Sequence, residues 1–101
     1  MLIKIAQVYL YTANIAEDAC NQARRWLDDN EIEYTLLNYA DESQHPQVFE
    51  ALNSWFGTNL SQFPVVVYDE LYDDQPSQRA FICGLTALTQ SNLAELYQLG
   101  R

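Results

Sequence analysis

The sequence predicts a small α/β protein with helices on both faces of a mixed sheet. Apolar residues make up 49% of the 101 residues and charged residues 19%, which is typical of a globular chain with one core. Segments rich in Val, Ile, Leu and Tyr alternate with segments of helical periodicity, in the order β-α-β-α-β-β-α. We therefore expect a single domain, residues 1–101, folded as a three-layer sandwich around a four-stranded mixed sheet.

The chain begins with an apolar strand over residues 2–11, which leads through a loop into a first helix. Asn14 is a suitable N-cap, and Glu17 three residues later completes a variant of the capping box. The apolar face of this helix consists of residues at helical spacing: Ala16, Ala19, Cys20, Ala23, Trp26 and Leu27. The polar residues Asp28, Asp29 and Asn30 end the helix, and residues 33–38 form a second strand. A strand-helix-strand beginning implies a parallel pair with a right-handed crossover.

A second helix is predicted after the polar link 41–45. Ser43 is a plausible cap, and Pro46 fits the first turn, where its missing N–H is not needed. The buried stripe of this helix is predicted from its apolar residues: Val48, Phe49, Leu52, Trp55 and Phe56. Gly57 lies where the helix should stop.

The rest of the chain predicts a hairpin and a final helix. Residues 63–68 form a third strand, residues 69–78 a polar loop, and residues 80–83 a short fourth strand, so strands three and four should be antiparallel. A last helix spans residues 91–99. Whether it begins earlier, at Thr86, is left open by the sequence.

The charge balance limits the classes of partner. Lys and Arg total 5 and Asp and Glu total 14, for a net charge of −9. This balance argues against binding nucleic acid or an anionic membrane surface. Two cysteines are too few for a disulfide-stapled secreted scaffold, and no run of apolar residues suits a signal peptide or a membrane span. We therefore expect a cytoplasmic protein, and any protein partner to present a basic surface.

Four short motifs, in this order, resemble the glutaredoxin family of the thioredoxin fold. They are Tyr11-Thr12 before the first helix, Cys20 followed by Ala23-Arg24-Arg25, Phe63-Pro64-Val65 at the third strand, and Ile82-Cys83-Gly84 after the fourth. The start of the loop, Tyr11-x-x-Asn14-Ile15, is similar to that of small glutaredoxins from tailed phages. The resemblance covers nearly the whole chain. It implies a thioredoxin-like, glutaredoxin-type fold with a cis peptide bond between Phe63 and Pro64.

The resemblance also shows what this chain lacks. Cys20 matches the second cysteine of the family's Cys-x-x-Cys motif, whereas Glu17 stands where the first, attacking cysteine belongs. A carboxylate cannot exchange with a disulfide, and the carboxylates of Glu17 and Asp18 would repel a thiolate. Cys20 shares its helix face with Ala23 and Leu27. We therefore expect a small, buried and inert thiol, with a reactive Cys20 as the alternative.

Family members hold glutathione in a groove beside the cis proline. In this chain Cys83 replaces a glycine of that groove and would crowd it, so no cofactor is expected, although glutathione stays an alternative. We predict that the same groove binds a protein segment or small ligand through these residues: Thr12, Asn14, Glu17, Phe63, Pro64, Cys83 and Gly84. A Cys20–Cys83 disulfide is not expected, because neither position suits the geometry.

An acidic cluster is the second candidate site. It consists of Asp69, Glu70, Asp73 and Asp74, in a loop longer than the family's usual turn, which suggests a partner-specific addition. The cluster lacks the ligand spacing of a calcium loop, and the single histidine, His45, has no Cys or carboxylate arranged beside it. No metal site is therefore predicted.

These features favour a redox-inactive binding module built on a glutaredoxin scaffold. The alternative is an atypical thiol–disulfide oxidoreductase that works through Cys20, Cys83 or both. A third possibility is a subunit that uses the fold mainly to dimerise.

Overall fold

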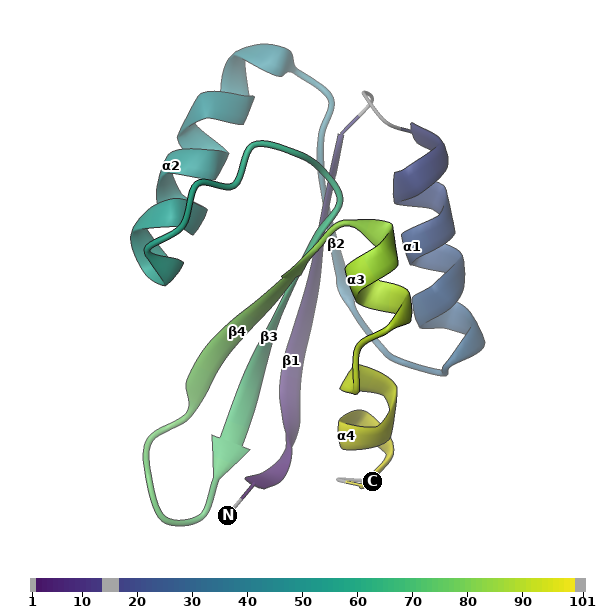
Figure 1. The fold of residues 1–101 in the computed structure, drawn as a ribbon, viewed down its shortest axis with the longest axis vertical. Helices are drawn as coiled ribbons and strands as arrows, with labels where there is room; N and C mark the ends of the chain where they lie inside the picture. Colours follow the sequence, from purple (N-terminus) through teal and green to yellow (C-terminus); the bar gives the residue numbers. More distant parts are fainter. Residues whose placement is uncertain (1, 14–16, 100–101) are drawn as a thin grey trace.

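The computed structural model describes residues 2–13 and 17–99, and it shows a mixed sheet between two layers of helices (Figure 1). The strands are β1 (Leu2–Ala13), β2 (Thr35–Tyr39), β3 (Val65–Tyr72) and β4 (Gln78–Cys83). The helices are α1 (Glu17–Asp29), α2 (His45–Phe56), α3 (Leu85–Thr89) and α4 (Leu93–Leu99), with a 3₁₀ turn, η1 (Glu42–Gln44), before α2. The predicted α/β architecture and element order are confirmed, with the final helical segment divided in two. Asn14, the predicted cap of the first helix, lies outside the described residues.

The sheet has the strand order β2-β1-β3-β4. β1 and β2 are parallel, with Leu10 opposite Leu36, and this confirms the predicted crossover through α1. β3 is antiparallel to both β1 and β4, and Val65 lies opposite both Tyr11 and Cys83. The carboxyl ends of β1, β2 and β4 therefore meet the amino end of β3 at one end of the sheet.

Two core clusters lie on the two faces of this sheet. The first is aliphatic and is shared with α1, α3 and α4: Ile5, Val8, Leu10, Ala23, Leu27, Ile32, Val66, Leu88 and Leu93. The second is richer in rings and is shared mainly with α2: Tyr11, Ala13, Cys20, Leu52, Phe63, Val65 and Val67. Figure 1 shows α2 on one face of the sheet and the other three helices on the opposite face. Alternating side chains of β1 and β3 thus supply both cores.

The start and the outer face of α2 differ from the prediction. Ser43 does not cap the helix, because its N–H and hydroxyl both donate to the carboxylate of Asp41, the residue that caps η1. Pro46 does lie in the first turn, and Gly57 ends the helix in the left-handed conformation (φ 63°) that favours glycine. The prediction that Trp55 is buried was wrong. Its side chain is 52% exposed and its ring lies 5.0 Å from the Arg79 guanidinium, which comes from β4 rather than from the helix.

The β3–β4 hairpin is longer than predicted. Asp69 and Glu70, expected in the loop, belong to β3, opposite Arg79 and Gln78. The Arg79 guanidinium donates to both carboxylate oxygens of Asp69, at 2.8 and 3.2 Å, and this bond raises the pKa of Arg79 above its ordinary value. The connection between the strands is therefore confined to residues 73–77.

Candidate functional site

Glu17 and Cys20 occupy the amino-terminal part of α1 in very different surroundings. Glu17 is the first residue of α1 and is exposed, where a carboxylate interacts favourably with the helix dipole. Cys20 is 4% exposed and belongs to the second core cluster, together with Ala13 and Phe63. The Cys20 thiol is free, as is the thiol of Cys83. The structure thus places the carboxylate in solvent and the neighbouring thiol in the core.

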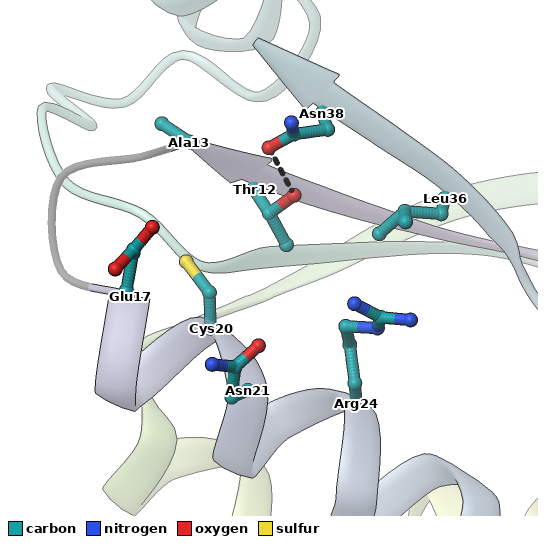
Figure 2. Close-up of a pocket in the computed structure, with 8 residues that line it drawn as sticks. All are labelled: Thr12, Ala13, Glu17, Cys20, Asn21, Arg24, Leu36 and Asn38. Carbon is teal, nitrogen blue, oxygen red and sulfur yellow. Dashed lines mark hydrogen bonds between the residues drawn. The ribbon is translucent and has the colours of Figure 1, made fainter. Parts of the chain in front are cut away.

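A small cavity, which we call the polar cavity, lies between α1 and the two strands β1 and β2 (Figure 2). Its volume is about 200 Å³, and it is lined by Thr12, Ala13, Glu17, Cys20, Asn21, Arg24, Leu36 and Asn38. The Thr12 hydroxyl donates to Oδ1 of Asn38 at 3.0 Å and so links the two strands at the cavity wall. Three predicted site residues, Thr12, Glu17 and Cys20, are therefore brought together here.

Five of the eight residues that line the cavity were not among the predicted site residues: Ala13, Asn21, Arg24, Leu36 and Asn38. Asn21 and Arg24 follow Glu17 at spacings of four and seven residues, which place all three side chains on one face of α1. This polar stripe is the sequence pattern from which Asn21 and Arg24 could have been predicted as site residues. Leu36 and Asn38 join the cavity only because β2 is parallel to β1 in the observed register.

The Phe63–Pro64 corner is built differently from the predicted groove. The peptide bond between the two residues is cis, the conformation that the resemblance implied. The Phe63 side chain is 5% exposed, and its ring lies 5.0 Å from that of His45 and 4.8 Å from that of Phe49. His45 is held in turn by a 2.8 Å hydrogen bond between Nε2 and the Tyr39 carbonyl oxygen. Phe63 is therefore a core residue, and its prediction as a groove wall needs correction.

Cys83 and Gly84 lie against this corner, as predicted. The Gly84 N–H donates to the Pro64 carbonyl oxygen at 3.1 Å, and the φ of 89° at Gly84 is one that other residues rarely adopt. The Cys83 Sγ lies 3.8 Å from the Gln62 carbonyl oxygen. Burial raises the pKa of the Cys83 thiol above its ordinary value, and among residues 2–13 and 17–99 no neighbouring charge opposes this shift. Cys83 is thus a poor source of thiolate.

The predicted acidic cluster is divided. Asp69 and Glu70 lie within β3, and the Glu70 carboxylate accepts a hydrogen bond from the Tyr72 hydroxyl at 3.2 Å. Asp73 and Asp74 lie in the connection between β3 and β4, at the opposite end of the sheet from the start of α1 (Figure 1). The acidic connection and the polar cavity are therefore separate surfaces.

Two further properties concern the described part of the chain. Residues 2–13 and 17–99 contain no group of three or more His, Cys, Asp or Glu side chains that could hold a metal ion. Within the same residues, no helix has the length and apolar character needed to cross a membrane.

No family model matches this sequence, and no curated protein matches it either. Among solved structures, the fold is similar to that of glutaredoxin 1 from Francisella tularensis, which was crystallised as a complex with cacodylate. The TM-score is 0.66 and the sequence identity 23%, over 91% of this chain and 96% of that chain. The chain has a thioredoxin-like fold of the glutaredoxin type. At this identity the glutaredoxin likeness shows the fold alone, so function has to be argued from the site.

Proposed function

We propose that this glutaredoxin-like chain is a redox-inactive binding module. The observation that supports this best is the different exposure of two side chains, Glu17 and Cys20, at the start of α1. An exposed carboxylate, Glu17, stands three residues before a buried thiol, Cys20, where the Cys-x-x-Cys motif would place its attacking cysteine. The scaffold then positions a ligand without forming a covalent bond to it.

The chemistry of exchange explains why this substitution matters. Reduction of a disulfide begins when a thiolate attacks one sulfur and the other sulfur leaves. Glu17 cannot perform this step, Cys20 is 4% exposed, and burial raises the pKa of Cys83. Neither thiol combines the exposure and the thiolate character that the reaction needs.

The binding partner is proposed to be a protein segment with a basic surface. The net charge of −9 supports this assignment, as does the position of Asp73 and Asp74 in an exposed connection. The segment would bind at the sheet end that carries Pro64, Cys83 and Gly84, and the β3–β4 connection with Asp73 and Asp74, at the opposite end of the sheet, would be a second contact of the same partner. A reducing, cytoplasmic setting and a phage-related origin belong to the same proposal, and they rest on the cysteine content and on the resemblance of the loop after Tyr11.

A turnover assay tests the proposal. The purified protein would be assayed for glutathione-dependent reduction of hydroxyethyl disulfide, beside its Cys20→Ser and Cys83→Ser variants. We expect no turnover above the rate of glutathione alone. Turnover by the unaltered protein that either substitution abolishes would overturn the proposal in favour of the oxidoreductase.

A gain-of-function variant serves as the positive control. Glu17→Cys restores the Cys-x-x-Cys spacing at an exposed helix start, so we expect it to introduce measurable exchange. Asp18→Cys is the matched control, because it adds an exposed thiol one residue away without that spacing.

The partner assignment has its own test. A protein captured from the host by the unaltered chain should be lost when Asp73 and Asp74 are both changed to Lys. Replacing the exposed carboxylates Asp28 and Asp29 of α1 in the same way is the matched control. Equal losses from the two double variants would assign the binding to net charge rather than to the β3–β4 connection.

A further inference from the structure

The polar cavity has opposite charges at its two ends. Glu17 and Arg24 are seven residues apart on one face of α1, which separates their backbone positions by about 10 Å along the helix axis. Figure 2 shows the two side chains at opposite ends of the cavity, with Cys20 and Asn21 between them. A carboxylate and a guanidinium arranged in this way complement a molecule that carries both charges.

Both charges are available to a ligand. Within residues 2–13 and 17–99, neither Glu17 nor Arg24 forms an ion pair, whereas the Arg79 guanidinium is engaged by Asp69. Both side chains are exposed, so neither bears the cost of a buried uncompensated charge. An ion pair with a ligand would add hydrogen bonds that the protein itself does not supply.

The walls between the two charges supply polar side chains and a small apolar surface. Oδ1 of Asn38 accepts a hydrogen bond from the Thr12 hydroxyl, and Figure 2 shows the Asn38 amide nitrogen on the side away from Arg24, so Thr12 and Asn38 form a polar wall and Arg24 is the anion-binding group. Leu36, 39% exposed, lies on the strand side near Arg24 in Figure 2, where it can contact a short hydrocarbon chain. Ala13 and Cys20 are small and leave the cavity open.

The volume limits the size of the occupant. About 200 Å³ equals the space of roughly seven water molecules, and it is below the ~300–1,000 Å³ typical of sites for drug-sized ligands. An α-amino acid carries its two charges on adjacent groups and is too short to reach both ends of the cavity. A short unbranched chain with one charge at each end suits both the separation and the volume.

We propose that the polar cavity binds a small ω-amino acid, with its carboxylate at Arg24 and its ammonium at Glu17. This inference rests on the proposed function, because it gives Glu17 a binding role in the place of a catalytic thiol. It concerns a small molecule on the β2 side of α1, and is distinct from the protein segment proposed at Pro64 and Gly84.

Titration with 6-aminohexanoate, followed by amide chemical shifts of the isotope-labelled protein, tests the inference. We expect saturable binding that shifts the amides of Thr12, Asn21 and Asn38. Arg24→Gln and Glu17→Gln should each weaken binding at least tenfold, since each removes one charge and keeps a side chain of similar size. Arg25→Gln is the matched control, because Arg25 is the neighbouring exposed cation and does not line the cavity. The spectrum of each variant shows directly whether the fold is retained.

Two ligand controls separate a zwitterion site from simpler ones. Hexanoate carries only the carboxylate and hexylamine only the ammonium, so each should bind at least tenfold more weakly than 6-aminohexanoate. Equal binding of hexanoate, unaffected by Glu17→Gln, would overturn the proposal in favour of a plain anion site. Absence of saturable shifts at millimolar ligand, or an equal loss in Arg25→Gln, would also overturn it.

The outcome is independent of the turnover assay. Absence of zwitterion binding together with absence of turnover would remove this inference and leave the redox-inactive module intact. Turnover by the unaltered protein would remove the module whatever the ligand titration showed.

Discussion

The two cysteines lie near the same end of the sheet, in surroundings that differ in almost every respect. Cys20, on α1, is 4% exposed within a core cluster and borders the polar cavity. Cys83, at the end of β4, is only partly buried, and its Sγ lies against the Gln62 carbonyl oxygen. One thiol is inaccessible, and the other is accessible but biased toward its protonated form.

This difference shows that the glutaredoxin fold alone does not provide an exposed and reactive thiol. The fold supplies a helix start and a cis-proline corner, and neither activates a thiol unless a cysteine is exposed at the helix start. In this chain that position holds Glu17, and the polar side chains of Asn21 and Arg24 on the same helix face line the polar cavity. Under our proposal the Cys20 side binds a ligand, whereas the buried Phe63 is mainly structural. Four predictions test this contrast.

The largest effect is expected at Phe63. Truncation by Phe63→Ala removes a ring packed between His45 and Phe49, and it should lower the free energy of unfolding by about 3–5 kcal/mol. Urea unfolding followed by circular dichroism measures the loss. Phe63→Leu, which keeps most of the volume, should lose clearly less. A loss below about 1 kcal/mol for the alanine variant would mean that Phe63 is a groove wall after all.

Thiol labelling compares the two cysteines directly. The Cys83→Ser variant retains only Cys20, and the Cys20→Ser variant retains only Cys83. With an aromatic disulfide reagent at fixed pH, we expect Cys20 to react about a hundredfold more slowly, because it must wait for local opening that costs about 2.7 kcal/mol. Equal rates in the two variants would contradict the burial of Cys20, and both should react fully in urea.

A smaller effect is expected at the wall of the polar cavity. Thr12→Val keeps the shape of the side chain and removes its hydrogen bond to Asn38, at a cost of about 1 kcal/mol. Thr35→Val, on the exposed part of β2, is the control and should change the free energy of unfolding little. If the two variants have equal stability, the Thr12–Asn38 bond does not contribute to joining the strands.

The smallest effect concerns the pH dependence of Cys83. Burial raises the pKa of its thiol, so at a given pH the Cys20→Ser variant should be alkylated by iodoacetamide more slowly than free cysteine. Its rate should still rise with pH where that of free cysteine has levelled. The raised pKa means that the folded state retains the proton longer. Stability should therefore fall as the pH rises above the ordinary thiol pKa of about 8.5. A rate that levels earlier than that of free cysteine would reveal a thiolate-stabilising group and would favour the oxidoreductase.

The fold was largely predictable because its signals are local. Apolar runs, helical spacing, Pro46 in a first turn and Gly57 after a helix each act within a few residues. Asp69 and Glu70 were misplaced because carboxylates are disfavoured in strands, and the partner that accommodates Asp69 there, Arg79, comes from the next strand. Trp55 was misplaced for a similar reason, since Arg79 covers one face of its ring.

The candidate site was predictable only in part. Glu17, Asn21 and Arg24 form a polar stripe that helical spacing alone would have revealed. Asn38 and Leu36 could not be predicted as site residues from the sequence, because their position depends on which residues of β1 and β2 are paired. The burial of Phe63 likewise depends on α2, whose rings reach it across the second core cluster.

The pairing of β1 with β3 has a consequence for how the chain assembles. Val8 lies opposite Tyr68, so the centre of the sheet joins segments that are far apart in the sequence, whereas β3 and β4 are neighbours. Long-range pairing must overcome the entropy of closing a large loop before its contacts form. The hairpin can therefore form early from its own residues. We expect the pairing of β1 with β3, which spans the largest sequence separation in the sheet, to form later than the hairpin.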